Sequence, residues 1–133
     1  MKSSQQLVNE AKSRITEVTV QDLASALQNH QCILIDVREA DEFATGHIDR
    51  AVNYPRGVLE MRIHQHPAVA SHCDATTALE LLAAKPIYLI CRSGARSALA
   101  ADALQNMGFS AIYSVAGGFQ AWLDAGYPFE PKA

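Results

Sequence analysis

The sequence has no apolar run long enough to cross a membrane, and it has no excess of positive charge. Its 11 basic and 14 acidic residues give a formal net charge of −3, which argues against nucleic acid as the main partner. Residues 1–8 are mostly polar and lack the apolar core of a signal peptide. We therefore expect neither nucleic-acid binding nor membrane binding.

Cysteine is scarce, and the three cysteines do not have the spacing of a disulfide framework: Cys32, Cys73 and Cys91. An odd number of cysteines in such a pattern favours a reducing compartment, so a cytoplasmic location is expected. In that setting the thiols stay available for chemistry. We interpret Cys32, inside an apolar run, as a small core residue. Cys73 is either inert or able to relay sulfur from Cys91.

Standard metal and nucleotide motifs are also missing. His64, His66, His72 and Cys73 match no common zinc spacing, so we interpret them as part of a polar surface segment. The glycine pair 117–118 is a turn rather than a phosphate loop, because the lysine and the spacing of such loops are absent. We expect no metal and no cofactor.

Short β-branched runs alternate with segments rich in alanine and leucine, and no linker or repeat interrupts them. We expect one domain over residues 1–133. Strands are predicted at 15–20, 32–37, 51–54, 86–90 and 111–115, the first of them at a sheet edge. Helices are predicted at 5–14 (within an N-terminal helical region, 1–14), 21–29, 38–44, 95–107, from Thr76 or Thr77 to Ala84, and around Trp122. This alternation predicts an α/β fold, a mostly parallel sheet with helices on both faces. Residues 56–75 are the least regular part, expected to hold a helix and a loop around Pro67.

One loop connects a predicted buried strand to a predicted helix, and its residues are Cys91, Arg92, Ser93, Gly94, Ala95, Arg96 and Ser97. The backbone N–H groups at a helix N-terminus have no partner within the helix, and the helix dipole adds positive charge there. The two arginines of the loop add further positive charge. Such a site favours a thiolate and binds an anion beside it, so Cys91 is predicted to be a reactive nucleophile.

The two loop arginines have different expected roles. We expect Arg96 to point its guanidinium at a bound anion or to lock the loop backbone, and Arg92 to face solvent and recruit anionic substrates. Asp36 and His47 are interpreted as structural, since a thiolate stabilised by the loop needs no general base.

Three motifs resemble those of a single-domain rhodanese, a thiosulfate sulfurtransferase-like protein. The first covers residues 35–39, 42–43, 46–48 and 51–55, the second is the 91–97 loop, and the third covers 117–119, Trp122 and 126–128. Residues 56–75 have no clear counterpart and are interpreted as a variable segment. The resemblance implies a five-stranded parallel sheet, and it suggests that Arg38 reaches the pocket. The alternative for Arg38 is an ion pair with Asp41 or Glu42.

The resemblance also implies a persulfide mechanism. Cys91 would take the outer sulfur from thiosulfate or a similar anionic donor, and a thiol or cyanide, with a thiol protein as one candidate, would accept it. A phosphatase or arsenate reductase of the related fold is the first alternative. Those enzymes place five residues between cysteine and arginine, whereas four separate Cys91 from Arg96, and no aspartate adjoins the loop as a general acid. The second alternative is a non-catalytic regulatory or sulfur-binding module, which the retained Cys91 disfavours.

Overall fold

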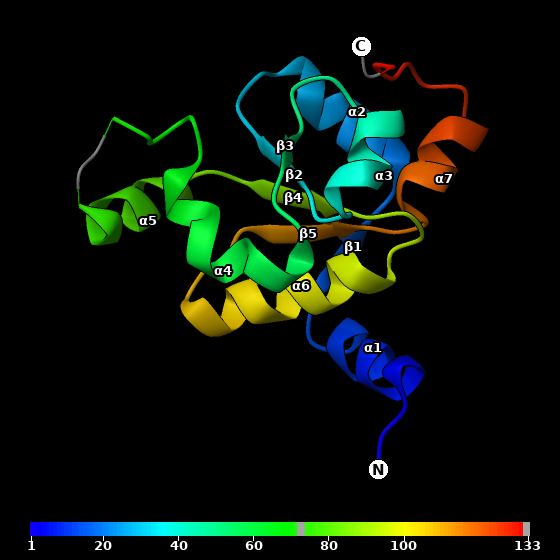
Figure 1. Ribbon diagram of the computed structural model, residues 1–133, viewed down its shortest axis with the longest axis horizontal. Helices are drawn as coiled ribbons and strands as arrows, with labels where there is room; N and C mark the ends of the chain where they lie inside the picture. The colour runs from blue at the N-terminus through cyan, green and yellow to red at the C-terminus, as the bar shows by residue number, and fades with distance from the viewer. Residues whose placement is uncertain (72–73, 132–133) are drawn as a thin grey trace.

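A five-stranded sheet forms the centre of the molecule in the computed structural model, which describes residues 1–71 and 74–131 (Figure 1). The strands are β1 (Thr16–Val18), β2 (Ile33–Asp36), β3 (Val52–Asn53), β4 (Ile87–Ile90) and β5 (Ile112–Val115). Their order is β1-β5-β4-β2-β3, and every pair is parallel. The α/β prediction is confirmed, including the position of the first strand at an edge.

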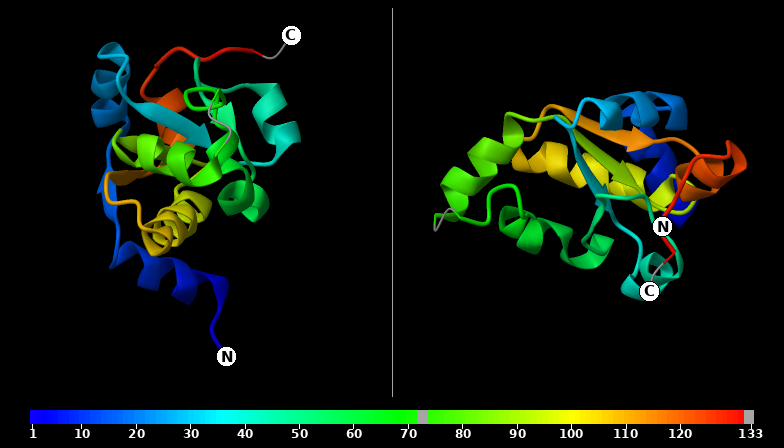
Figure 2. Two further views of the ribbon diagram at one scale, coloured as in Figure 1. Left: turned by 90° about the vertical axis from the view of Figure 1, so that its left-hand side faces the viewer. Right: turned by 90° about the horizontal axis from the view of Figure 1, so that it is seen from above.

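Helices cover both faces of this sheet (Figures 1 and 2). The α-helices are α1 (Ser4–Lys12), α2 (Val20–Gln28), α3 (Ala40–Thr45), α4 (Leu59–Arg62), α5 (Ala75–Ala83), α6 (Ala95–Met107) and α7 (Gly118–Asp124). Figure 1 shows α1, α4 and α6 on one side of the sheet, and α2, α3 and α7 on the other. Ala78 and Leu82 of α5 pack into the core on the α6 side. In the described part of the chain, no helix is both long and apolar enough to span a bilayer.

The period-two alternation of the strands divides the core into two clusters. Ile35 and Leu89 point into a cluster with α4, α5 and α6, whereas Leu34 and Ile90 point into a cluster with α2 and α7. Cys91, directly after β4, belongs to the first cluster. The sulfur is therefore on the side of the sheet that α6 covers.

The segment 56–71 is more ordered than its sequence predicts. It contains two 3₁₀ turns, η1 (Arg56–Val58) and η2 (Ile63–Gln65), on either side of α4. Leu59, Ile63 and Val69 are buried in the α6-side core. Their spacing fits neither a long helix nor a strand, which is why sequence periodicity did not reveal them. His72 and Cys73 lie outside the described residues.

The start of α5 corrects one prediction. Asp74, rather than Thr76 or Thr77, is the N-cap, and its carboxylate accepts hydrogen bonds from the backbone N–H groups of both threonines. Aspartate and threonine are both good N-caps, so composition alone did not distinguish them.

Candidate active site

Cys91 lies at the carboxyl end of β4, the place where open α/β sheets bind ligands. Its side chain is buried, with 1% of the residue exposed. Sγ accepts hydrogen bonds from the backbone N–H groups of Gly94, at 3.0 Å, and Ser97, at 3.3 Å. These donors, together with the N-terminus of α6, stabilise negative charge on the sulfur.

Gly94 gives the loop its shape as the N-cap of α6. Its φ is +104°, a left-handed conformation that glycine adopts without steric cost. A Cβ here would lie 3.3 Å from the backbone nitrogen of Gly117. The loop thus depends on glycine both for its turn and for its close approach to the start of α7.

The start of α7 is hydrogen-bonded to the backbone of the cysteine loop. The backbone N–H of Phe119 donates to the Cys91 carbonyl at 2.8 Å, and that of Gln120 donates to the Arg92 carbonyl at 3.1 Å. Gly118, at φ +60°, lets the two segments meet, since a Cβ there would lie 2.4 Å from the Cys91 carbonyl oxygen. The sequence predicted a turn at this glycine pair but not its contact with the cysteine loop. The placement of the pair directly before a helix was the available signal.

Arg96 has a carboxylate partner that the sequence did not predict. Its guanidinium forms a two-pronged ion pair with the carboxylate of Glu42 on α3, at 2.6 and 3.0 Å. The hydrogen bond from Arg96 is the main reason that the pKa of Glu42 falls to about 2. The same pair raises the pKa of Arg96. Arg96 therefore joins α6 to α3 across the carboxyl edge of the sheet.

This ion pair gives a testable acid dependence. The folded pKa of Glu42 lies below its ordinary value of 4.5, so the pair contributes stability that is present above pH 4.5 and is lost as pH falls toward 2. We expect the free energy of unfolding to fall less between about pH 5 and pH 3 in Glu42→Gln than in the wild type. Urea denaturation at both pH values measures this. An equal fall in both proteins would show that the pair adds no acid-sensitive stability.

Arg38 is ion-paired, but its partner differs from the two carboxylates considered above. Its guanidinium binds Asp36 at 2.8 Å, and both side chains are buried. It also donates to the Gly46 carbonyl at 2.8 Å and lies over the ring of Phe119, 4.5 Å from the centroid. Asp36 in turn accepts from the Arg38 backbone N–H at 3.0 Å, consistent with its expected structural role. Arg38 thus fixes the loop after β2 against α7.

A shallow hollow of about 370 Å³ opens beside the loop. It is bordered by Arg38, Glu42, Arg92, Phe119 and other residues of α3 and α7. Arg92 is exposed, as expected, and adds positive charge at its rim. The hollow has room for a small anion or for the end of a larger acceptor.

The remaining candidates contribute less. Ser93 is exposed and Ala95 half-buried at the start of α6. His47 stacks on the ring of Phe43 with centroids 3.8 Å apart, which agrees with a structural role. Burial raises the pKa of the half-buried Cys32 thiol, which makes it a weak nucleophile. Within residues 1–71 and 74–131, no group of three or more His, Cys, Asp or Glu side chains is arranged to hold a metal.

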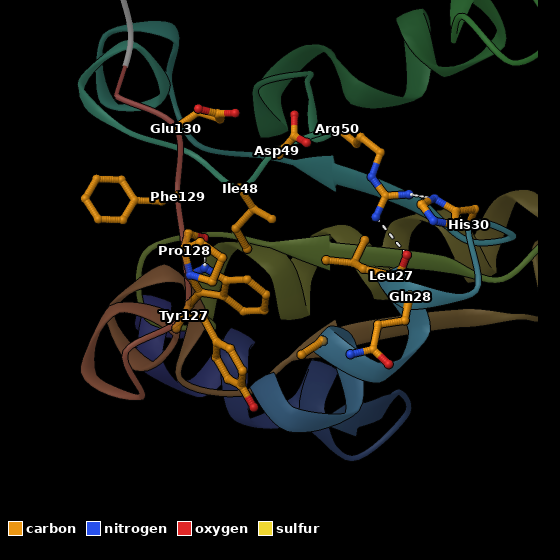
Figure 3. Close-up of a pocket in the computed structure, with 12 residues that line it drawn as sticks. Leu27, Gln28, His30, Ile48, Asp49, Arg50, Tyr127, Pro128, Phe129 and Glu130 are labelled. Atoms are coloured by element: carbon orange, nitrogen blue, oxygen red, sulfur yellow. Dashed lines mark hydrogen bonds between the residues drawn. The ribbon is translucent and has the colours of Figure 1, made fainter.

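A second hollow, of about 630 Å³, lies between α2 and the C-terminal tail (Figure 3). Leu27, Ile48 and Trp122 contribute apolar surface to it, and Arg50 binds the Leu27 carbonyl at 2.7 Å on one side. Residues 91–97, all of which the structure describes, do not line it. It is separate from the cysteine loop.

The protein is therefore an α/β domain with a parallel sheet. Its buried cysteine lies at a strand–helix junction, in a loop whose backbone N–H groups point at the sulfur. The sequence profile described as Rhodanese-like domain matches residues 19–125. The chain belongs to the rhodanese-like domain family.

Curated relatives include proteins with and without an assigned activity. The chain is 38% identical to YqhL of Bacillus subtilis over 89 residues. This aligned region covers 67% of the chain and 59% of YqhL. The chain spans 54% of a second Bacillus subtilis relative. It is 34% identical over 107 residues to the thiosulfate sulfurtransferase GlpE of Pseudomonas savastanoi pv. phaseolicola, covering 80% of this chain and 86% of that protein.

Solved structures share the fold over nearly the whole chain. A Rhodopseudomonas palustris protein described as of unknown function and a possible tyrosine phosphatase is 29% identical, with a TM-score of 0.80 and coverage of 98% of this chain and 96% of that one. The polysulfide-sulfur transferase of Wolinella succinogenes is 31% identical, with a TM-score of 0.71 and coverage of 93% and 84%. The descriptions of these two neighbours thus name two different activities, a possible phosphatase and a sulfur transferase.

Proposed function

We propose that the protein is a sulfurtransferase that carries a sulfane sulfur on Cys91 as a persulfide. One observation carries the proposal: the buried Sγ receives two backbone N–H groups from its own short loop at a helix N-terminus. The resemblance to GlpE and to the polysulfide-sulfur transferase supports the same chemistry.

The first half-reaction is a displacement at sulfur. The Cys91 thiolate attacks the outer sulfur of thiosulfate, so that a new S–S bond forms. The bond between the outer sulfur and the sulfonate sulfur breaks, and its electron pair leaves with sulfite. The negative charge then resides on the terminal sulfur of the persulfide, where loop N–H groups and the dipole of α6 stabilise it.

The second half-reaction restores the cysteine. Cyanide or a thiolate attacks the terminal sulfur, the Cys91 S–S bond breaks, and the Cys91 thiolate leaves with the electron pair. The products are thiocyanate or a new persulfide, and the two steps give ping-pong kinetics. A thiol protein is a further candidate acceptor, and we propose that the reaction takes place in the cytoplasm.

The two loop arginines, Arg92 and Arg96, have different roles. Arg92, exposed at the rim, attracts the anionic donor. Arg96 forms an ion pair with Glu42, and this pair holds α3 against the loop. We therefore assign donor recruitment to Arg92 and the shape of the site to Arg96.

A phosphatase is the second candidate, because a neighbour with a TM-score of 0.80 is described as a possible tyrosine phosphatase. Loop size argues against it. Four residues separate Cys91 from Arg96, one fewer than the phosphatases use to enclose a tetrahedral oxyanion, and this arginine is already bound to Glu42. The alternative nevertheless predicts a different product and is open to direct assay.

Two assays on the wild type separate these candidates. We expect thiocyanate from thiosulfate and cyanide, and no useful hydrolysis of an aryl phosphate. Insertion of one glycine between Gly94 and Ala95 widens the loop, so the N–H groups cease to converge on the sulfur and sulfur transfer should fall by about 100-fold. Strong aryl phosphate hydrolysis by the wild type without sulfur transfer would reverse the assignment.

A further inference from the structure

Ser114 is a buried polar residue in the middle of the apolar sheet. It lies on β5, in register with Leu89 of β4, and has 0% of its surface exposed. Two positions after Ile112, it shares the face that Ile112 presents to the α6-side core. A hydroxyl buried in such a place is costly unless it has a hydrogen-bond partner.

The partner is a second buried hydroxyl that contacts the reactive sulfur. Ser114 Oγ lies 2.8 Å from Ser97 Oγ, and Ser97, in the first turn of α6, is also 0% exposed. As the neutral thiol, Cys91 Sγ donates to Ser97 Oγ across 3.5 Å. Within the described residues, Ser97 is the hydrogen-bond partner of the Ser114 side chain. The three side chains therefore form a short chain that ends at the sulfur.

The count of hydrogens in this chain depends on the charge of the sulfur. A neutral thiol and two hydroxyls carry three polar hydrogens, but the chain has only two contacts, Cys91 to Ser97 and Ser97 to Ser114. One buried hydrogen therefore stays unpaired. A negatively charged sulfur only accepts. The Ser114 hydroxyl then donates to Ser97, the Ser97 hydroxyl donates to the sulfur, and both hydrogens are used. A buried unpaired donor is costly, so the chain favours the anion.

We propose that Ser114 is a positioning residue for Cys91 that acts through Ser97. Its hydroxyl holds the Ser97 oxygen in place and polarises the Ser97 O–H toward the sulfur, because hydrogen bonds that point the same way along a chain strengthen one another. This inference rests on the sulfurtransferase proposal for its purpose, which is to keep both the thiolate and the persulfide anionic.

The pH dependence of Cys91 alkylation by iodoacetamide, followed by peptide mapping, tests this role without any sulfur donor. Failure of sulfur transfer therefore leaves the test intact. In Ser114→Ala we expect the alkylation midpoint to rise and the rate below that midpoint to fall by about twofold to fivefold. Ser114→Thr, which keeps the hydroxyl, should restore the wild-type midpoint. Ser114→Cys, with its weaker donor, should lie between the two and replaces the alanine variant if that variant does not fold.

A double-mutant cycle separates positioning from mere packing. Ser97→Ala should raise the alkylation midpoint further than Ser114→Ala does. The double variant, Ser97→Ala with Ser114→Ala, should have the same midpoint as Ser97→Ala alone. The charged groups around the sulfur stay the same in every variant, namely Arg92, Arg96 with Glu42, and Arg38 with Asp36. An unchanged midpoint in Ser114→Ala, or equal shifts in both backgrounds, would overturn the proposal.

Discussion

Replacement of Cys91 by serine is expected to lower thiosulfate:cyanide sulfur transfer below about one-thousandth of the wild-type rate. A hydroxyl cannot form the S–S bond on which both half-reactions depend. The loop N–H groups keep an acceptor atom in the serine oxygen, so the free energy of unfolding should change by less than about 1 kcal/mol. Steady-state kinetics and urea denaturation of the same preparation measure the two effects.

Cys32 provides the matched control for this substitution. It is a thiol directly before β2, on the α2 and α7 side of the sheet. Cys32→Ala should keep most of the activity, and we expect the same of Cys73→Ala. A large loss in Cys73→Ala would support a sulfur relay from Cys91, and transfer that survives Cys91→Ser would remove Cys91 from the mechanism.

The second large effect is expected at Gly118, which packs against the backbone of the cysteine loop. In Gly118→Ala the new Cβ would lie 2.4 Å from the Cys91 carbonyl oxygen and 2.6 Å from the Arg92 carbonyl carbon. These are backbone atoms, so the loop and α7 must separate. We expect a loss of about 2–4 kcal/mol in stability and a fall of about 100-fold in sulfur transfer, because the loop donors shift relative to the sulfur.

Gly126→Ala is the control for Gly118→Ala. Gly126 also has a positive φ, at +79°, but a Cβ there meets nothing within 4 Å. This variant carries only the conformational strain, about 1–2 kcal/mol, and should leave kcat unchanged. Equal effects on sulfur transfer in the two variants would mean that the close contact with the cysteine loop is unimportant. Thermal unfolding and kinetics of both variants test the comparison.

The fold was largely predictable because its signals are local. Apolar runs such as 86–90, and the glycine that ends α6 at Gly108, mark strands and helices by period and by stop signals. Residues 56–71 were less predictable. Leu59 begins α4, Ile63 begins η2 and Val69 follows them, so three short segments with no common sequence period bury these side chains. Tertiary packing, rather than local propensity, determines their place.

The candidate site was predictable in position but not in its charge pairing. Cys91 and its loop follow from a cysteine between a strand and a helix. The partner of Arg96 is Glu42, which lies 54 positions away in the sequence. The partner of Arg38 is Asp36, two residues before it and buried with it. Ser114 gave no signal because a serine in a strand is ordinary until its neighbours are known. Such pairings depend on which elements meet at the sheet edge.

Intact-mass spectrometry of the wild-type protein after exposure to thiosulfate tests the central claim most directly. We predict that the protein gains the mass of one sulfur atom, that peptide mapping places it on Cys91, and that cyanide removes it. Cys91→Ser should gain nothing under the same conditions. A wild-type protein that gains no sulfur, or that gains it on Cys32 instead, would contradict the account.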